Sequence, residues 1–162
     1  MRRVDKAVTD LEEIMKIIQK CDVCRLGMAD DNLPYIVPMS FGFTLIEGKM
    51  TLYFHCANEG KKLDIMRKNP AVCFEMDCGS NVIRHDENAC SFSMAYESII
   101  GNGRIQPITD RMMKEEALCQ IMLHYEPNKR FSFSDKQLEN ITMLKLNVDT
   151  FEAKRSVKKQ SS

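Results

Sequence analysis

The chain has 162 residues, of which 44% are hydrophobic and 28% are charged, and its formal net charge is zero. This length and composition predict one soluble globular domain over residues 1–162, with an ordered core from about residue 9 to residue 153. The neutral balance argues against a nucleic-acid partner, and no apolar run is long enough to cross a membrane. Because the N-terminus is polar and charged rather than a secretory signal, we expect a cytoplasmic protein.

The seven cysteines are odd in number and irregularly spaced. Cys21 and Cys24 have the spacing of a redox or metal-binding pair, but zinc needs two further ligands at a matching spacing, and the sequence has no second pair of this kind. We therefore expect no metal site. Free thiols in a reducing compartment, most of them buried, are the better interpretation of the cysteines.

In chain order, the first elements are a helix and two strands. Thr9 and Glu12 form a capping box ahead of apolar residues at helical spacing, which predicts an amphipathic helix over residues 10–20. Alternating apolar residues predict a strand over 24–28 and, after a turn, a second strand over 35–43. The apolar face of the second strand holds Tyr35, Val37, Met39, Phe41 and Phe43.

Pro38 interrupts the pattern of this second strand. Proline has no N–H to give to a ladder, so the strand is an edge, carries a bulge or leaves its neighbour. Its second face, which holds Ile36, Pro38, Ser40 and Gly42, is mostly small or polar and leaves room for something flat beside the backbone. An edge strand that simply faces solvent explains the same pattern.

A strand, a turn and a short helix follow one another between Leu52 and Pro70. The residues of the strand alternate, so that its two faces are Leu52, Phe54 and Cys56 on one side and Tyr53 and His55 on the other. The turn covers residues 57–60. The helix ends before Pro70, because a proline disfavours helical backbone at the residue ahead of it.

Lys61 and Lys62 occupy the first turn of this short helix. Cations are out of place there, because the free N–H groups and the dipole of a helix start favour anions. A bound phosphate would resolve the conflict, since the N–H groups and both ammonium groups could converge on it. Two lysines that point into water are the alternative.

The rest of the chain predicts longer strands and two helices. A strand over 71–78 is followed by a polar loop over 79–89 and a long strand over 90–108, in which Gly101 and Gly103 mark a bulge or bend. Thr109 or Asp110 is expected to cap a helix, whose predicted core stripe is Met113, Ala117, Ile121 and Tyr125.

Ser134 is expected to cap a short helix to about residue 140. A final strand begins at Thr142, and the basic segment over 154–162 is expected to be a solvated tail. Strands at short intervals, joined by hairpin-like turns, favour an antiparallel barrel with flanking helices over βαβ units.

This order of motifs resembles the FMN-binding split-barrel family of pyridoxamine 5′-phosphate oxidase-like proteins, and within it the nitroimidazole-resistance (Nim) type. The resemblance runs from about residue 2 to residue 155. Its most specific part is a His-x-Ala-x-x-Gly-[Arg/Lys]-Lys arrangement, which matches residues 55–62. Weaker matches follow the family order at 22–26, 34–42, 72–75 and 96–104. The fold that this implies is an antiparallel Greek-key split β-barrel, mainly β with flanking helices and homodimeric.

The resemblance also implies a flavin site at the interface of the homodimer. Lys61 and Lys62 match the pair that holds the phosphate of FMN in that family. The strand segment along the isoalloxazine ring matches Val37, Pro38, Met39 and Ser40, and the residues along the ribityl chain match His55, Cys56, Ala57 and Asn58. A polar residue on a later strand is matched by Ser98. A histidine near the flavin in Nim-type proteins matches His55, which is therefore the candidate catalytic residue.

The function expected from the resemblance is an FMN-dependent oxidoreductase that reduces a small electrophile such as a nitroimidazole or another nitroaromatic. A non-catalytic protein of the same fold that binds a flavin or a haem-type ligand is the alternative. His55 could equally be a barrel-wall histidine with a satisfied hydrogen bond. The first of the two cationic residues that hold the phosphate is often Arg in the family and is Lys61 here. A lysine keeps the positive charge but cannot form the two parallel hydrogen bonds of an arginine. The absence of tryptophan and of an Arg-rich C-terminal pocket argues against oxidation of vitamin B6.

Overall fold

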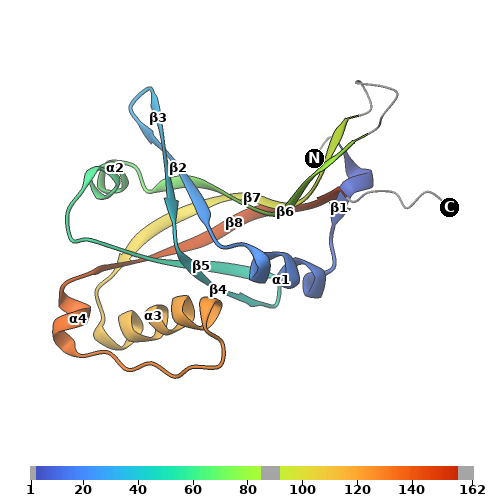
Figure 1. Cartoon of the computed structure of the whole chain (residues 1–162). Coiled ribbons are helices and arrows are strands. Elements are labelled where there is room, and N and C mark those ends of the chain that lie inside the picture. The colour runs from blue at the N-terminus through green and yellow to red at the C-terminus, as the bar shows by residue number, and fades with distance from the viewer. Residues whose placement is uncertain (1–2, 85–91, 157–162) are drawn as a thin grey trace.

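The computed structural model describes residues 3–84 and 92–156, which form mainly β structure (Figure 1). The strands are β1 (Ala7–Val8), β2 (Cys24–Asp30), β3 (Leu33–Met39), β4 (Phe41–Ile46), β5 (Lys49–Cys56), β6 (Ala71–Ile83), β7 (Ser93–Ile108) and β8 (Thr142–Ser156). A 3-10 turn, η1 (Val4–Lys6), precedes them, and the helices are α1 (Leu11–Lys20), α2 (Lys61–Lys68), α3 (Arg111–Tyr125) and α4 (Asp135–Glu139). The described strands form one antiparallel sheet in the order β3-β2-β6-β7-β8-β5-β4, with β1 added to β8. The expected antiparallel split barrel with flanking helices is confirmed.

The barrel closes through a strand that changes its neighbour. β3 and β4 lie at opposite ends of the sheet order, although Ser40 alone separates them in the chain. β3 pairs with β2, whereas β4 pairs with β5. The sheet therefore curls back on itself at Ser40, and the single strand predicted over 35–43 is two strands. The interpretation of Pro38 as a residue of an edge strand that leaves its neighbour is confirmed.

Tyr125, at the end of α3, stabilises the break at Ser40. Its hydroxyl accepts a hydrogen bond from the N–H of Phe41 at 3.1 Å and donates one to the carbonyl of Asp22 at 2.8 Å. It thereby satisfies backbone groups that a regular ladder would have paired. Tyr125 and Met113 of the predicted core stripe are 38% and 45% exposed, so only the middle of that stripe is buried.

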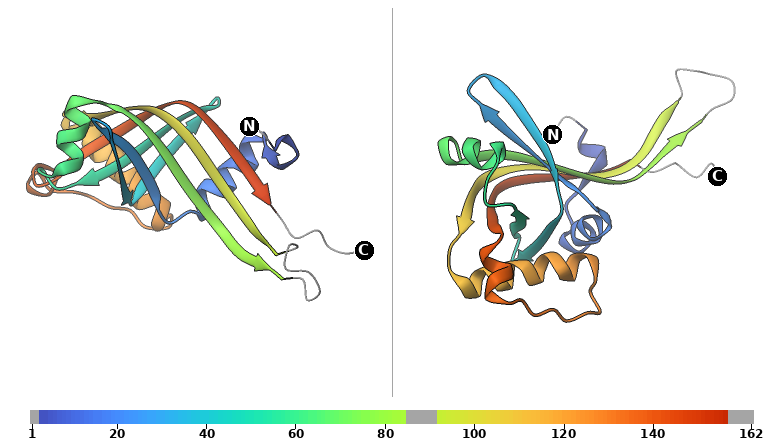
Figure 2. Two further views of the ribbon diagram at one scale, coloured as in Figure 1. Left: turned by 90° about the horizontal axis from the view of Figure 1, so that it is seen from above. Right: turned by 60° about the vertical axis from the view of Figure 1, so that its left-hand side comes forward.

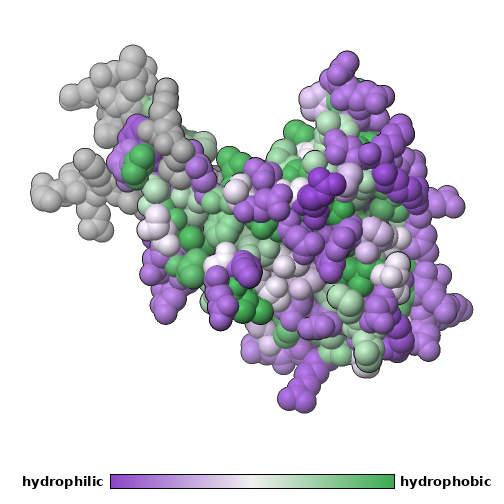
Figure 3. Space-filling model, turned by 180° about the vertical axis from the view of Figure 1, so that it is seen from behind, coloured by the Kyte–Doolittle hydropathy of each residue, from purple (hydrophilic) through white to green (hydrophobic). Residues whose placement is uncertain are grey.

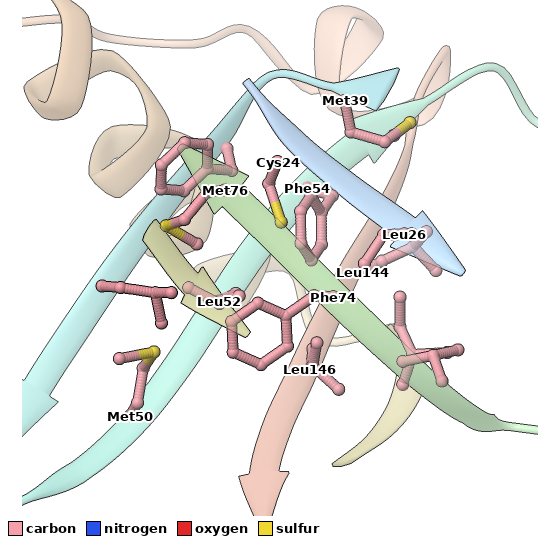
Figure 4. Close-up of a cluster of buried hydrophobic side chains, with 14 of the residues drawn as sticks. Cys24, Leu26, Met39, Met50, Leu52, Phe54, Phe74, Met76, Leu144 and Leu146 are labelled. Carbon is pink, nitrogen blue, oxygen red and sulfur yellow. The ribbon is translucent and has the colours of Figure 1, made fainter. Parts of the chain in front are cut away.

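The main core fills the inside of the barrel (Figure 4). Its members are alternate residues of the strands, and β5 follows the predicted pattern: Leu52, Phe54 and Cys56 are buried. They pack in one cluster with Phe74 of β6 and Leu144 of β8. Each large apolar side chain buried in this way contributes roughly 1.5–3 kcal/mol. The inner face of β5 is therefore core, and its outer face is left to other elements.

A second, smaller core lies on the outer face of β5 and β8, where α3 and α4 cover the sheet (Figure 1). Its buried members come from β7, β8 and the two helices: Ile108, Ala117, Leu118, Ile121, Leu138 and Met143. Tyr53 of β5 packs against this cluster. The two faces of β5 thus serve two cores, one inside the barrel and one under α3.

The helix caps differ in detail from the sequence prediction. Asp10, not Thr9, caps α1, because its carboxylate accepts a hydrogen bond from the N–H of Glu13 at 2.9 Å. The predicted capping box is therefore wrong by one residue. Asp110 is the residue that caps α3, and Ser134 caps α4 as predicted.

Two strands are longer than their apolar patterns indicate. β6 continues to Ile83, although a polar loop was expected from residue 79, because its last residues pair with β7. β8 continues to Ser156, which pairs with Tyr96, although a solvated tail was expected from residue 154. The rest of that loop (85–91) and of that tail (157–162) lies outside the described residues. Backbone pairing, which needs no apolar face, extends both strands.

Two hairpins project from the barrel (Figure 2). The far ends of β6 and β7 form an arm on one side, and the β2–β3 hairpin rises beside α2 on the other. The predicted irregularity in the long strand is confirmed as a register shift between Asn102 and Gly103 against β8. Within the described ranges, no helix is both long and apolar enough to span a membrane.

Candidate functional site

The start of α2 is open. Gly60, at the N-cap, has φ 140° and ψ 159°, a conformation that favours glycine, and no described side chain caps the helix. The N–H groups of Leu63 and Asp64 bond to the carbonyl of Gly60 at 2.9 and 3.3 Å. The amides ahead of them, those of Lys61 and Lys62, have no acceptor inside the helix. Such groups and the helix dipole together favour an anion.

Lys61 has an anionic partner within its own chain. Its Nζ lies 3.4 Å from Oδ2 of Asp30, the last residue of β2, and 5.0 Å from the ring centre of Tyr35 on β3. Its side chain is 52% exposed and that of Asp30 is 25% exposed. The sequence prediction assigned Lys61 to a phosphate and did not foresee this partner.

Lys62 is placed differently. It is half-buried, and among the described residues no carboxylate oxygen lies within 4.0 Å of its ammonium group. It lies close enough to Cys56 to act on that thiol: burial raises the pKa of Cys56, and the charge of Lys62 opposes the rise. A partly buried cation without an anionic partner, beside an open helix start, is the strongest sign of an anion site in the described chain.

The turn between β5 and α2 is held by Asn58. Its amide Nδ2 donates to the carbonyl of Glu139 at 2.9 Å, and its Oδ1 accepts from the hydroxyl of Thr142 at 2.9 Å. These bonds join the turn to the end of α4 and the start of β8. The side chain of Asn58 therefore already has partners at both ends, while the neighbouring Ala57 is exposed.

His55 lies on the outer face of β5. It pairs directly with Met143 of β8, which belongs to the core under α3, so the two side chains share that face. Its Nδ1 is buried and has no hydrogen-bond partner among the described residues. The expected alternative of a wall histidine with a satisfied hydrogen bond therefore does not describe Nδ1.

The segment expected along a flavin ring alternates between the core and the surface. Val37 packs against the main core and Met39 is buried in it, whereas Pro38 and Ser40 are exposed. Ser40 lies near the hydroxyl of Tyr125, whose pKa is raised by burial. Only one edge of β3 has a strand partner among the described residues, so backbone N–H and C=O groups along the other edge are available to a ligand.

Ser98 is not close to the start of α2 within one chain. It pairs with Asp77 and Lys154 toward the arm, six positions from Arg104, which pairs with Ala71 at the start of β6. Six residues of strand span roughly 20 Å. The structure therefore brings Lys61, Lys62, Cys56 and the β2–β3 hairpin together, and leaves Ser98 apart.

A partly open cavity of about 200 Å³ lies between α2, the end of β7 and the start of β8. Its walls are mostly apolar, with polar groups from three residues: Arg67, Gln106 and Thr142. Sequence reasoning missed all three. Gln106 and Thr142 sit in strand patterns that carry no local signal of a site, and Arg67 is one of several cations on a short helix.

A shallower groove of about 480 Å³ lies on the outward side of β2, β3 and β6. Pro34, Ile36, Gly27 and Cys73 are among its lining residues, and Ile36 is 67% exposed. Apolar surface is also visible between the arm and the body in the space-filling view (Figure 3). A contiguous apolar face of this kind is typical of a surface that another molecule covers.

The cysteines form no metal centre in the described chain. Cys21 and Cys24 are buried, and burial raises the pKa of both thiols. Cys21 donates to the carbonyl of Ile17 at 3.3 Å and Cys78 lies 3.9 Å from the same oxygen. Cys73 is exposed, which the expectation of mostly buried thiols did not foresee for this strand.

Comparisons with known proteins agree with this geometry. The sequence pattern of the family described as pyridoxamine 5′-phosphate oxidase matches residues 10–155. A protein from Bacteroides thetaiotaomicron, described as a candidate 5-nitroimidazole antibiotic resistance protein, is 34% identical over 91% of this chain and 85% of its own, with a TM-score of 0.78. No curated protein matches the chain.

Two more distant structures share the fold. The flavocytochrome Anf3 from Azotobacter vinelandii is 19% identical, with 98% of this chain and 72% of that chain covered and a TM-score of 0.79. An FAD- and haem-binding protein from Mycobacterium smegmatis is 18% identical, with 97% and 76% covered and a TM-score of 0.82. At this identity the likeness concerns the fold alone.

Proposed function

The chain belongs to the pyridoxamine 5′-phosphate oxidase family, and from this premise we propose that it is an FMN-binding flavoprotein that reduces a small electrophile. The observation that carries the proposal is the open start of α2, beside which the partly buried Lys62 has no anionic partner among the described residues. A phosphate there would gain charge-assisted hydrogen bonds from groups that otherwise have none.

The residues around this point fit the parts of FMN. The phosphate would lie at the start of α2, whose first two residues are Lys61 and Lys62, and the ribityl chain along residues 55–58. The isoalloxazine ring would lie along residues 37–40, where the free edge of β3 offers backbone groups to its pyrimidine end and exposed Pro38 leaves room for a flat ring. When bound, FMN supplies the acceptor and donor of electrons, and the chain supplies binding and orientation.

We propose a homodimer in which a second copy covers the outward apolar face and completes the site. The support is that Ser98 lies far from α2 within one chain, while Ile36 and Ile100 are 67% and 52% exposed. In a dimer, Ser98 of one subunit could reach the flavin of the other. Sedimentation at micromolar concentration that shows only monomer would contradict an interfacial site.

The substrate class comes from the 34%-identical relative, whose description concerns 5-nitroimidazole resistance. We propose that a nitroaromatic is reduced to its amine, with electrons from a reduced nicotinamide nucleotide through the flavin and with the nitro oxygens leaving as water. We place the protein in the cytoplasm, because all six described cysteines are free thiols.

His55 would at most orient the substrate or give it a proton. We expect His55→Ala to keep FMN and to slow nitro reduction, measured as reoxidation of the reduced flavin by a nitroimidazole. An unchanged rate in the flavin-replete variant would make His55 a structural residue. If the wild-type protein binds FMN and shows no turnover with nitroaromatics, the protein is a flavin carrier and not a nitroreductase.

The experiment that tests FMN binding is a fluorescence titration of the protein with FMN and with riboflavin, which lacks the phosphate. A charge-assisted hydrogen bond is worth about 1.5–3 kcal/mol, so Lys62→Ala should weaken FMN roughly ten- to a hundredfold and change riboflavin far less. Lys68→Ala removes the same charge from the far end of α2 and is the matched control. Equal losses of both flavins in Lys62→Ala, or no loss of either, would contradict the phosphate assignment.

A further inference from the structure

The two lysines at the start of α2 differ in what they already contact. Lys61 has the carboxylate of Asp30 at 3.4 Å and the ring of Tyr35 at 5.0 Å, whereas Lys62 has neither kind of partner among the described residues. Lys68, about two turns further along the helix, lies 4.0 Å from the other oxygen of Asp30. Each carboxylate oxygen of Asp30 therefore lies near one lysine of α2.

These contacts reach both strands of one hairpin. Asp30 is the last residue of β2, and Tyr35 lies on β3, so Lys61 touches the hairpin on either side of its turn. The helix and the hairpin stand side by side in both views of Figure 2. No other charged side chain of the described chain makes such a pair of contacts with the hairpin's outer half.

The outer half of the hairpin is held by side-chain packing and not by further strand pairing: Met28 is buried in the main core and Tyr35 packs against it. β2 pairs with β6 only from Arg25 to Gly27, so beyond Gly27 neither strand has a further neighbour in the described sheet. The same hairpin carries residues 37–40, the segment proposed for the flavin ring. Residues 37–39 lie at the inner end of the hairpin, opposite Cys24, Arg25 and Leu26, so a contact between its outer half and α2 acts on the ring segment through β3.

We propose that Lys61 is a positioning residue, which with Asp30 and Tyr35 holds the β2–β3 hairpin against α2, and that Lys62 alone of the two lysines binds the phosphate. This inference rests on the proposed function for its second half only. The first half concerns the protein without any ligand. If the ammonium group of Lys61 left Asp30 for a phosphate, that phosphate would lie near a carboxylate whose remaining cation is Lys68, at 4.0 Å. The arrangement in which each anion has its own lysine avoids this repulsion.

The test on the ligand-free protein is amide hydrogen exchange. In Lys61→Met the amides of residues 28–36 should exchange about two- to fivefold faster than in the wild type. The variant loses an exposed ion pair and a cation–π contact, and the loss of either contact should raise the exchange rate by no more than about this factor. Lys62→Met, with the same change one residue along, should leave these amides unchanged. Lys61→Arg should keep the wild-type exchange rate, because an arginine can both pair with the carboxylate of Asp30 and stack on the ring of Tyr35.

The test with ligand uses the charge-neutral double variant Asp30→Asn with Lys61→Met, titrated with FMN and riboflavin. Removing both charges avoids leaving Asp30 alone near the phosphate. We expect both flavins to weaken two- to fivefold and the preference for FMN over riboflavin to stay within about twofold of the wild type. Lys62→Met should instead lose that preference by tenfold or more.

The outcomes separate this inference from the proposed function. A double variant that loses the FMN preference tenfold would show that Lys61 grips the phosphate and would overturn the inference, as would unchanged exchange in Lys61→Met. A wild-type protein that binds FMN no better than riboflavin would overturn the proposed function. The exchange measurement alone would then decide whether Lys61 holds the hairpin.

Discussion

At the start of α3, the carboxylate of Asp110 accepts a hydrogen bond from the N–H of Met113 at 2.9 Å, whereas at the start of α2 Gly60 has no side chain to offer. The remaining α-helices in the described chain resemble α3, with Asp10 and Ser134 as their caps. The first turn of α2 adds two lysines where the other helices carry a cap oxygen.

The difference between the two helix starts shows how a chain can leave a helix N-terminus open to a ligand. Free N–H groups at a helix start need an acceptor, and a side-chain oxygen one to three residues away is the usual one. Where no side-chain oxygen caps the helix and cations occupy its first turn, the acceptor for the free N–H groups must come from water or from a ligand. The cap of α3 therefore serves the structure of the helix, and the start of α2 is where we propose that an exogenous anion binds.

The strongest way to break this comparison is to give α2 the cap that α3 has. In Gly60→Asp, the new carboxylate would occupy the phosphate position, and we expect FMN affinity to fall at least tenfold relative to Gly60→Ala, with riboflavin little changed. Both variants carry the strain of a side chain at φ 140°, about 1–3 kcal/mol, so Gly60→Ala is the control for it. The measurement is flavin fluorescence. Equal FMN affinity in the two variants would mean that no phosphate binds here.

The reverse change removes the cap of α3. Asp110→Ala should lower the free energy of unfolding by about 1 kcal/mol, because the N–H of Met113 loses its acceptor. FMN affinity should stay at the wild-type value, since this helix start serves stability alone. Denaturant titration gives the first quantity and flavin titration the second. Asp110→Asn keeps a side-chain acceptor and should retain most of the stability. A loss of FMN binding in Asp110→Ala would contradict the view that only the start of α2 binds a ligand.

The smallest expected effect is that of salt. If Lys62 holds a phosphate from a half-buried position, raising ionic strength from about 0.1 to 1 M, which shortens the Debye length from about 10 to 3 Å, should weaken FMN a few-fold at most. Riboflavin, which carries no charge, should be unaffected and serves as the control ligand. Titrations at both salt concentrations check this. A steep loss of FMN, by a hundredfold or more, would instead indicate an exposed and purely electrostatic site.

Local pattern was sufficient for much of the fold. Alternation in β5 predicted which residues enter the barrel, and Glu47 and Gly48, with φ 50° and 78°, form a two-residue turn ahead of it. The proline at position 38 correctly indicated a strand that leaves its neighbour. These features succeed because each depends on residues within a few positions of one another.

The features that the sequence did not predict depend on residues far apart in the chain. β6 and β8 are longer than predicted because their ends pair with β7 rather than face a core. Tyr125 was assigned to the core by its helical spacing, but a hydrogen bond to a strand 84 positions away decides its orientation. In the site, Gln106 and Thr142 line a cavity beside α2 without any motif that would have selected them.

The sequence by itself determined that a helix begins after Gly60 with two lysines, and that this start carries no capping side chain, because these are properties of consecutive residues. Only the tertiary structure decided that the two lysines are unequal. Asp30 reaches Lys61 because the β2–β3 hairpin lies beside α2. Lys62 has no carboxylate within ion-pair distance in the described part of the chain, and its charge opposes the rise in the pKa of Cys56. A charge's partner is set by distance in space, and no spacing along the chain specifies it.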